Sequence, residues 1–224
     1  MKIKRLGDVD PGLLEWNDQM YSKHPTPYTG IAGFIERARV RAVLKLAEVG
    51  HNDSVLEIGC ESGNLLASIP DAKRIVGADI SQVALEDAAN RFEGRQLLPE
   101  FLQLDAQQPL GFSAGEFDVI ICSETLEHVH DPRSLLENIH KISTPDTRIV
   151  ISVPIEAPKI FVKKLLNVTG LFKLFFKGIE MRQSEWHLQA FSKEDLHDIS
   201  SGLFEVTRDK TVWAIHYVVR LSKK

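Results

Sequence analysis

Short apolar runs alternate with longer amphipathic stretches between about residues 35 and 153. The apolar runs have the length of strands, and the stretches between them repeat apolar residues at helical spacing. Strands are predicted at 54–58, 74–78, 100–104, 117–122 and 148–153, and helices at 34–49, 64–69, 81–92 and from Pro132 onward. This alternation predicts βαβ units and a mostly parallel sheet.

The ends of these elements carry the residues that begin and stop helices. Gly50 follows the first helix as a stop signal, Ser81 precedes the third as an N-cap, and Pro132 occupies the first turn of the fourth. Residues 203–212 and 213–221 alternate β-branched and aromatic side chains and are predicted to pair antiparallel at an edge of the sheet.

Length and charge limit the choice of function. With 224 residues, 43% of them hydrophobic, the chain has material for one substantial core. A net charge of -4 gives no overall basic surface, so a nucleic-acid partner is not favoured. The first residues lack the apolar core of a secretory signal, and no run reaches the length of a membrane span.

The two cysteines favour a reducing compartment. Cys60 and Cys122 each end an apolar run, where buried thiols are more probable than a disulfide framework. We therefore expect a cytoplasmic protein with reduced cysteines.

The loop after the first predicted strand has the features of a cofactor site. Gly59 and Gly63 allow a sharp turn and a close approach of the backbone to a ligand. Their spacing differs from the dinucleotide pattern G-x-G-x-x-G, and the carboxylate of Glu57 would repel a pyrophosphate. An ordinary strand-to-helix turn that merely needs a glycine remains the alternative.

Two aspartates follow the next strands. Asp79 stands where an acidic side chain accepts hydrogen bonds from ribose hydroxyls, and Asp105 stands where a carboxylate can read an adenine edge. Each could instead cap a helix or lie in a solvated loop. Together with the glycine turn they indicate an adenosine-like cofactor without a pyrophosphate.

The sequence resembles the class I S-adenosylmethionine-dependent methyltransferases, and within them the ubiquinone-biosynthesis O-methyltransferase type. The resemblance rests on VLEIGCESGNLL (55–66), VGADIS (76–81), LDAQ (104–107), FDVIICSETLEHVHDP (117–132) and RIVISVP (148–154). It implies an α/β fold with a Rossmann-like, doubly wound, seven-stranded and mostly parallel sheet whose last strand is antiparallel. It also implies direct methyl transfer from S-adenosyl-L-methionine, with no covalent enzyme intermediate.

The resemblance carries over a set of cofactor-binding residues. Glu57, Gly59 and Gly63 would lie near the amino-acid end, Asp79 would hold the ribose, Ile80 would pack on adenine, and Asp105 with Ala106 would bind the adenine edge. Cys60, Glu61 and Ser123 complete the set. Glu61 stands where the family most often has a further glycine, which puts cofactor affinity in question.

A cluster of acidic and imidazole groups follows the fourth central strand. His128, with Glu127, is the candidate general base, because imidazole titrates near neutral pH and the position faces the expected methyl donor. The segment also resembles the divalent-metal site of small-RNA 2′-O-methyltransferases, with Glu124, Glu127, His128 and His187 as ligands. Capping of the next helix or lining of the pocket, without metal, is the favoured alternative.

Two regions are predicted to lie outside the central sheet and its helices. Residues 1–34 are predicted to form an N-terminal flap, and 35–224 the methyltransferase domain with a variable insertion at about 155–192. Within it, residues 158–178 combine apolar and basic residues without an acidic one, which is typical of a substrate lid or of peripheral contact with an anionic membrane.

The function predicted from these observations is O-methylation of a small or lipid-like acceptor. The alternatives are a methyltransferase-fold protein that binds cofactor without transfer, a metal-assisted RNA 2′-O-methyltransferase, and a nicotinamide oxidoreductase. The glycine spacing and the two aspartates argue against the last.

Overall fold

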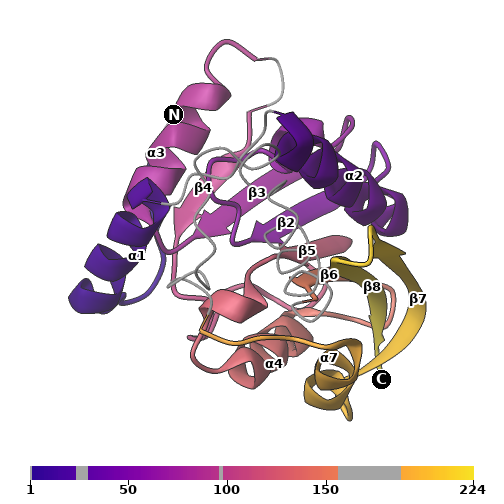
Figure 1. Ribbon diagram of the computed structural model, residues 1–224. Coiled ribbons are helices and arrows are strands. Elements are labelled where there is room, and N and C mark those ends of the chain that lie inside the picture. The colour runs from indigo at the N-terminus through magenta and orange to yellow at the C-terminus, as the bar shows by residue number, and fades with distance from the viewer. Residues whose placement is uncertain (1, 24–29, 96–97, 156–187) are drawn as a thin grey trace, which may run out of the picture.

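The computed structural model describes residues 2–23, 30–95, 98–155 and 188–224, which share one eight-stranded sheet (Figure 1). The strands are β1 (Ile3–Arg5), β2 (Ser54–Ile58), β3 (Arg74–Asp79), β4 (Glu100–Gln103), β5 (Val119–Ser123), β6 (Arg148–Pro154), β7 (Phe204–Val212) and β8 (His216–Lys223). Their order across the sheet is β1-β4-β3-β2-β5-β6-β8-β7. The strands from β1 to β6 run parallel, and β8 is antiparallel to both of its neighbours.

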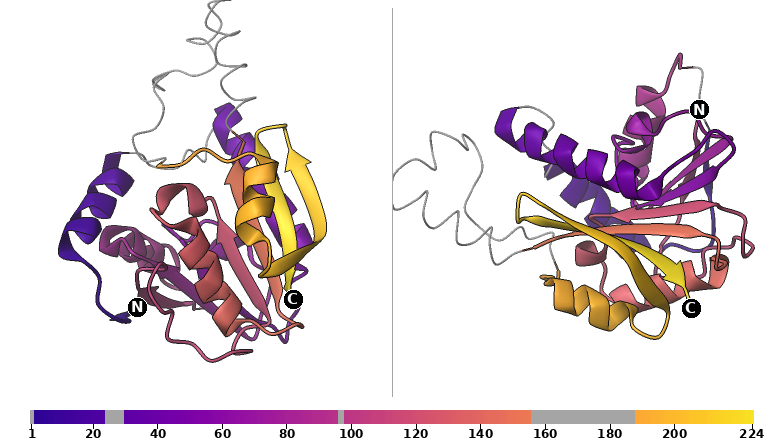
Figure 2. Two further views of the ribbon diagram at one scale, coloured as in Figure 1. Left: turned by 90° about the horizontal axis from the view of Figure 1, so that it is seen from below. Right: turned by 90° about the vertical axis from the view of Figure 1, so that its right-hand side faces the viewer.

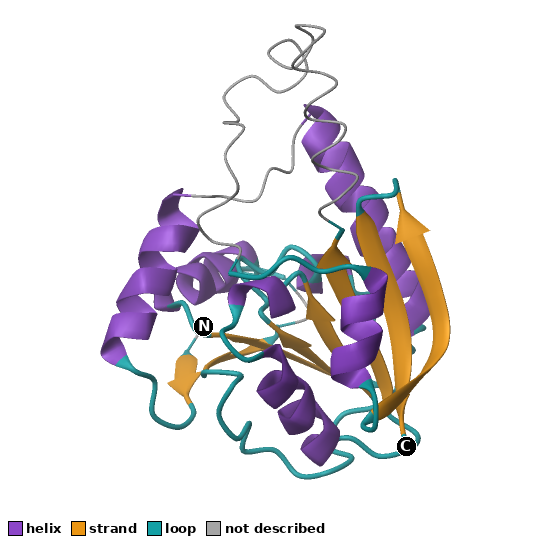
Figure 3. Cartoon of the chain, turned by 60° about the horizontal axis from the view of Figure 1, so that its bottom comes forward, coloured by secondary structure: helices purple, strands orange, loops and turns teal. Residues whose placement is uncertain are grey.

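Helices cover both faces of the sheet (Figures 2 and 3). They are α1 (Pro11–Lys23), α2 (Gly30–Ala47), α3 (Gln82–Arg91), α4 (Pro132–Ile142) and α7 (Lys193–Ser200), with short 3-10 turns η1 (Leu66–Ser68) and η2 (Leu126–His128). One apolar cluster fills the space between the sheet and α2 and α3, and a second lies beneath α4 and α7. Among the described helices, none combines the length and apolar character that crossing a bilayer requires.

The predicted α/β architecture with a parallel sheet and a reversed last strand is confirmed. Ser81 caps α3 by accepting a hydrogen bond from the Ala84 backbone N–H, and Pro132 is the first residue of α4, as predicted. The strand at 54–58 has the predicted bounds.

The predicted number of seven strands is wrong, because β1 adds an eighth at the edge beside β4. Its residues, Ile-Lys-Arg, show no alternation that would distinguish a strand, and the pairing with β4 defines it. The helix predicted at 34–49 is α2, which starts at Gly30, four residues before the predicted start. The helix predicted at 64–69 is the single 3-10 turn η1.

The N-terminal stretch assigned to a flap contributes β1 and α1 to the described structure. Most of the insertion predicted at 155–192, including 158–178, lies outside the described residues. Its two ends lie together: Ile155 N–H donates to the Ile215 carbonyl (2.8 Å), Leu188 N–H donates to the Glu127 carbonyl (2.8 Å), and Ile155 forms a parallel bridge with Phe191.

Parallel strands place their carboxyl ends at the same edge of the sheet, and the loops after β2, β3, β4 and β5 therefore meet there. Because β8 runs the other way, its first residue, His216, lies at this edge too, opposite Pro154 of β6. Side chains far apart in the sequence are brought together at this edge.

Candidate functional site

The loop after β2 bends over the end of β3. Gly59 has a φ of +74°, in the left-handed region that favours glycine, and the N–H groups of Gly59 and Cys60 both donate to the Ala78 carbonyl, at 2.8 and 3.0 Å. A Cβ on Gly59 would overlap the Thr125 side chain of the loop after β5. Glycine is therefore required where these two loops touch.

Glu57 is a buried carboxylate beneath this loop. It shares a face of β2 with Val55, and this face points toward α2. The side chain is 3% exposed, and its Oε2 atom has no hydrogen-bond partner among the described residues. Burial raises the pKa of Glu57 well above its usual range, although the nearby Arg39 guanidinium opposes the shift. A cationic ligand group would match this oxygen.

Asp79 joins the two loops at the ends of β2 and β3. Its Oδ2 accepts the Glu61 N–H (2.8 Å), and its Oδ1 accepts the Ser81 N–H (2.9 Å). Burial raises the pKa of Asp79, whereas these backbone donors act in the opposite direction. Each carboxylate oxygen keeps one further lone pair for a ligand hydroxyl.

Glu61, the residue expected at a glycine position, has a φ of +47°. Left-handed backbone is costly for a residue with a side chain, which explains why glycine suits this position. The Glu61 side chain is partly exposed, and its N–H contributes to holding Asp79.

The ends of β3 and β4 carry the residues predicted to contact adenine. Ile80 is partly exposed, and its carbonyl accepts a hydrogen bond from Gln103 Nε2 (3.2 Å). Asp105 accepts the Gln107 N–H (2.9 Å), which stabilises its own turn, and the Ala106 carbonyl accepts from Asn138 (3.2 Å). These contacts fix the loop while Asp105 and Ala106 stay partly exposed at the ligand edge.

The cysteines do not contribute a thiolate to the site. Cys60 points into the core between the sheet and α2, and Cys122 is fully buried in β5; both are free, as predicted. Burial raises the pKa of Cys60 well above its usual range and that of Cys122 to about 12. Cys60, which is one of the predicted cofactor residues, can therefore offer a ligand only its backbone.

Ser123, at the end of β5, begins a chain of buried polar contacts. Its hydroxyl accepts a hydrogen bond from the Arg39 guanidinium of α2 and lies 2.8 Å from the Ser152 hydroxyl of β6. Ser152 in turn donates to Glu124 Oε1 (2.8 Å). The chain connects α2, β5 and β6 at the ligand edge.

The same chain closes through Glu124 and His216. Glu124 has a φ of +54°, and its Oε2 lies 3.0 Å from His216 Nδ1. His216 Nε2 lies 3.9 Å from Glu36 Oε1, and the Arg39 guanidinium is paired with Glu36 (2.7 Å). A ring of polar side chains results, with Arg39 and His216 buried. Sequence reasoning missed both, because nothing local links residue 39 or 216 to the loop after β5.

The candidate base lies next in the same loop. His128 is in η2, and its Nε2 lies 3.9 Å from Glu127 Oε1, so the predicted pair is adjacent in space. Glu127 is 1% exposed, and its carbonyl accepts the backbone N–H groups of Leu188 and Gln189. The His128 side chain is 19% exposed and is accessible to a ligand, whereas the Glu127 side chain is buried.

The predicted metal set is not assembled among the described residues. The Glu124 carboxylate contacts Ser152 and His216, and His187 lies outside the described ranges. In the part of the chain that is described, no three His, Cys, Asp or Glu side chains are grouped to hold a metal ion. The sequence favoured a segment without metal, and the metal site stays the alternative hypothesis.

Acidic side chains predominate at this edge. They are Glu57, Glu61, Asp79, Asp105, Glu124 and Glu127, beside the buried Arg39. Such an edge attracts cationic and hydroxyl groups and repels a pyrophosphate.

Comparisons with known proteins match this chain to methyltransferases. Residues 56–149 match a family model described as a methyltransferase domain. A ubiquinone biosynthesis O-methyltransferase of Pseudomonas aeruginosa is 25% identical over 199 residues, which cover 86% of this chain and 73% of the relative. The corresponding protein of Aeromonas salmonicida is 30% identical over 127 residues, 55% of this chain and 52% of the relative.

Solved structures share the fold at low sequence identity. The N-methyltransferase NodS of Bradyrhizobium japonicum, in complex with S-adenosyl-L-homocysteine, superposes with a TM-score of 0.65 at 18% identity, covering 94% of this chain and 98% of that one. The [4+2]-cyclase SpnF gives a TM-score of 0.64 at 14% identity, covering 82% of this chain and 80% of that one. At such identities the likeness shows the fold, and SpnF shows that the fold also serves other chemistry.

The raised pKa of Glu57 predicts a pH-dependent difference in stability between the protein and its Glu57→Gln variant. Above the ordinary glutamate value of 4.5 the unfolded chain loses this proton while the folded protein keeps it. The stabilising contribution of the protonated Glu57 side chain is therefore lost as pH rises toward its folded-state pKa. The free energy of unfolding of wild type minus variant should fall by up to about 1.4 kcal/mol per pH unit in that window.

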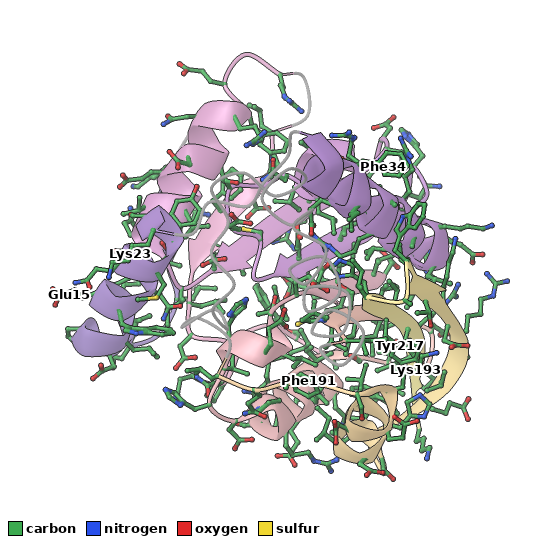
Figure 4. All side chains as sticks on the ribbon, in the orientation of Figure 1. Glu15, Lys23, Phe34, Phe191, Lys193 and Tyr217 are labelled. Atoms are coloured by element: carbon green, nitrogen blue, oxygen red, sulfur yellow. The ribbon has the colours of Figure 1, made fainter. Side chains whose placement is uncertain are left out.

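Urea denaturation from pH 5 to pH 8 measures this difference. Glu15→Gln is the control, because Glu15 is an exposed carboxyl on α1 that points away from the core (Figure 4). A constant difference between wild type and Glu57→Gln across the range would contradict the assignment of a buried, protonated carboxyl.

Proposed function

We propose that this chain is a class I S-adenosylmethionine-dependent methyltransferase that methylates an oxygen of a small acceptor. The observation that carries the proposal is Glu57: a buried carboxylate with an unpartnered oxygen directly below a glycine turn. This oxygen suits the ammonium of a methionine moiety, which favours the ionised form of Glu57.

The residues at the ligand edge fit the rest of the cofactor. Asp79 has lone pairs for the ribose hydroxyls, and Ile80 offers an apolar side chain to the adenine ring. Asp105 with the backbone of Ala106 would bind the adenine edge. The buried guanidinium of Arg39, beside Ser123, is the matching charge for the methionine carboxylate.

The reaction requires the protein to align the acceptor with the methyl donor and to provide one general base. When bound, S-adenosylmethionine supplies an electrophilic methyl group on its sulfonium. The loops after β2 and β5 would align acceptor and donor, and His128 would take the hydroxyl proton as the oxygen–methyl bond forms. Buried thiols with raised pKa values fit a reaction without a covalent enzyme intermediate.

An oxygen acceptor is supported by the relatives, which are named for O-methylation in ubiquinone biosynthesis. We extend this to a small or lipid-like hydroxyl compound. NodS, an N-methyltransferase, shares the fold, so the acceptor atom needs a direct test. Cofactor binding without transfer is the competing hypothesis, for which Glu61 in left-handed backbone is the specific reason.

The cofactor site predicts the result of calorimetry. The wild type should bind S-adenosylmethionine and S-adenosylhomocysteine, and Glu57→Gln or Asp79→Asn should each weaken binding by about tenfold or more, because a charge-assisted hydrogen bond is lost. Binding should also release protons, since an ammonium favours the ionised form of Glu57.

Asp71→Asn is the matched control, because Asp71 precedes β3 at the opposite edge of the sheet and pairs with His51. Absence of binding by the wild type would overturn the proposed function. Equal binding by all variants would keep a cofactor role but reject this site.

His128 as general base predicts a loss of turnover with intact cofactor binding. His128→Asn should reduce kcat for a phenolic acceptor by about 10²–10⁴-fold, the usual contribution of a positioned base, and flatten the acid side of the pH profile. His130→Asn is the control, since His130 is an exposed imidazole two residues away. Unchanged turnover in His128→Asn at saturating acceptor, with or without magnesium, would exclude this role.

A lipid-like acceptor fits the composition of residues 158–178, which mix apolar residues with five lysines and contain no acidic residue. We propose that they make peripheral contact with an anionic membrane. The wild type should co-sediment with anionic vesicles and a Lys163→Glu/Lys164→Glu/Lys173→Glu variant should not. Absence of both from the vesicle pellet would refute the contact, and a cytoplasmic location without membranes would then remain the prediction.

A further inference from the structure

Helix α1 packs against α3, beside the loops that hold Asp79 (Figure 2). Its contact with the start of α3 is made by one carboxylate, Asp18. Asp18 Oδ1 accepts the Ser81 hydroxyl at 2.6 Å and the Val83 backbone N–H at 3.3 Å. A residue from the N-terminal stretch thus reaches the turn between β3 and α3.

Ser81 connects this contact to the helix end. Its hydroxyl oxygen accepts the Ala84 N–H (3.1 Å) as the N-cap of α3, and its single hydroxyl proton is donated to Asp18. Ser81 is 2% exposed, so water has little access to replace a lost partner. The negative charge of Asp18 also lies at the positive end of the α3 dipole. Asp18 therefore selects the rotamer of Ser81.

Ser81 also connects Asp18 to the candidate ribose ligand. The Ser81 backbone N–H donates to Asp79 Oδ1 (2.9 Å), while Glu61 N–H donates to Oδ2 (2.8 Å). The orientation of the Asp79 carboxylate thus depends on the place of the Ser81 backbone. Because Ile80 lies between the two, the contact from α1 reaches the turn that carries both Asp79 and Ile80.

A second contact fixes the position of α1 on α3. The Tyr21 hydroxyl donates to Asp87 Oδ2 (2.7 Å), and burial together with Asp87 raises the pKa of Tyr21. Farther along α3, Arg91 Nε donates to the Ser62 carbonyl of the glycine loop (2.8 Å). The phenol is thus held as a neutral donor, and α1, α3 and the glycine loop are connected through side chains.

We propose that Asp18 is a positioning residue for the nucleoside half of the cofactor site. It acts through Ser81 on Asp79 and so on the ribose hydroxyls, without itself touching the cofactor, while Tyr21 keeps α1 in register. The inference rests on the proposed function, because it concerns the same cofactor. It assigns to α1 a role in cofactor affinity that neither the glycine motif nor the strand-end aspartates indicate.

The test compares two ligands on the same variants. Asp18→Ala should weaken binding of S-adenosylhomocysteine by about tenfold, as expected when an ionised hydrogen-bond acceptor is lost, and Asp18→Asn, which keeps an oxygen acceptor, should restore most of it. With the 2′,3′-dideoxy analogue of S-adenosylhomocysteine, Asp18→Ala and wild type should bind equally, because the ribose hydroxyls through which Asp18 acts are missing.

Asp10→Ala is the matched control on the same helix. Asp10 Oδ1 accepts the Leu13 N–H (2.8 Å) at the start of α1 and has no contact with the turn after β3. The substitution removes a cap from α1 and should leave the affinities for both S-adenosylhomocysteine and its dideoxy analogue unchanged. Thermal unfolding of every variant confirms that the fold is retained.

The outcomes separate this inference from the proposed function. No binding of S-adenosylhomocysteine by the wild type would overturn both. Binding by the wild type with equal affinity for Asp18→Ala, or an equal loss for the two ligands, would overturn the positioning role alone. Amide hydrogen exchange at Val83 and Ala84 gives a readout without ligand: it should accelerate in Asp18→Ala, and unchanged protection would contradict the coupling.

Discussion

The site depends on the contact between the loops that leave β2 and β5. These strands are neighbours, but the chain passes from β2 to β3 and β4 on one side and returns to β5 on the other. The two loops therefore leave the sheet at the point where the strand order reverses, which is where open α/β sheets place their ligands. Thr125 occupies the space that a side chain at Gly59 would need, so the two loops are in contact there. A bulkier residue would move both ligand loops together.

A second constraint is the cost of burying charge at this point. Glu57 is buried as the neutral, protonated acid, because burial raises its pKa. Arg39 keeps its charge and is paired with Glu36 and Ser123. Under the proposed function, the ammonium of the cofactor would meet the Glu57 oxygen that has no hydrogen-bond partner among the described residues. The free protein thus has an unmet polar interaction at Glu57 for which the proposed ligand offers a complement, which is how a preorganised site gains affinity.

Elements with a strong local pattern could be predicted from the sequence. β2 and β5 are continuous apolar runs, and the caps at Ser81 and Pro132 use residues whose preference is local. The glycines and strand-end acids could be placed at one edge because a parallel sheet aligns carboxyl ends. In contrast, β1 is three residues long and is defined only by its pairing with β4. The local sequence pattern therefore predicts seven strands instead of eight. The sequence did not predict Arg39, His216 or Asp18 for the same reason. Each reaches the site from an element whose position only the tertiary fold determines.

The anchored ends of the 156–187 segment have a consequence for evolution. Ile155 is hydrogen-bonded to Ile215, and Leu188 to the carbonyl of Glu127, so the chain leaves and re-enters the fold at fixed, neighbouring points. Closing a longer connection between such points costs little, about 0.6 kcal/mol for each doubling of its length. Sequence between these anchors can therefore diverge, lengthen or be grafted from a relative while the strands and the donor-binding loops keep their places.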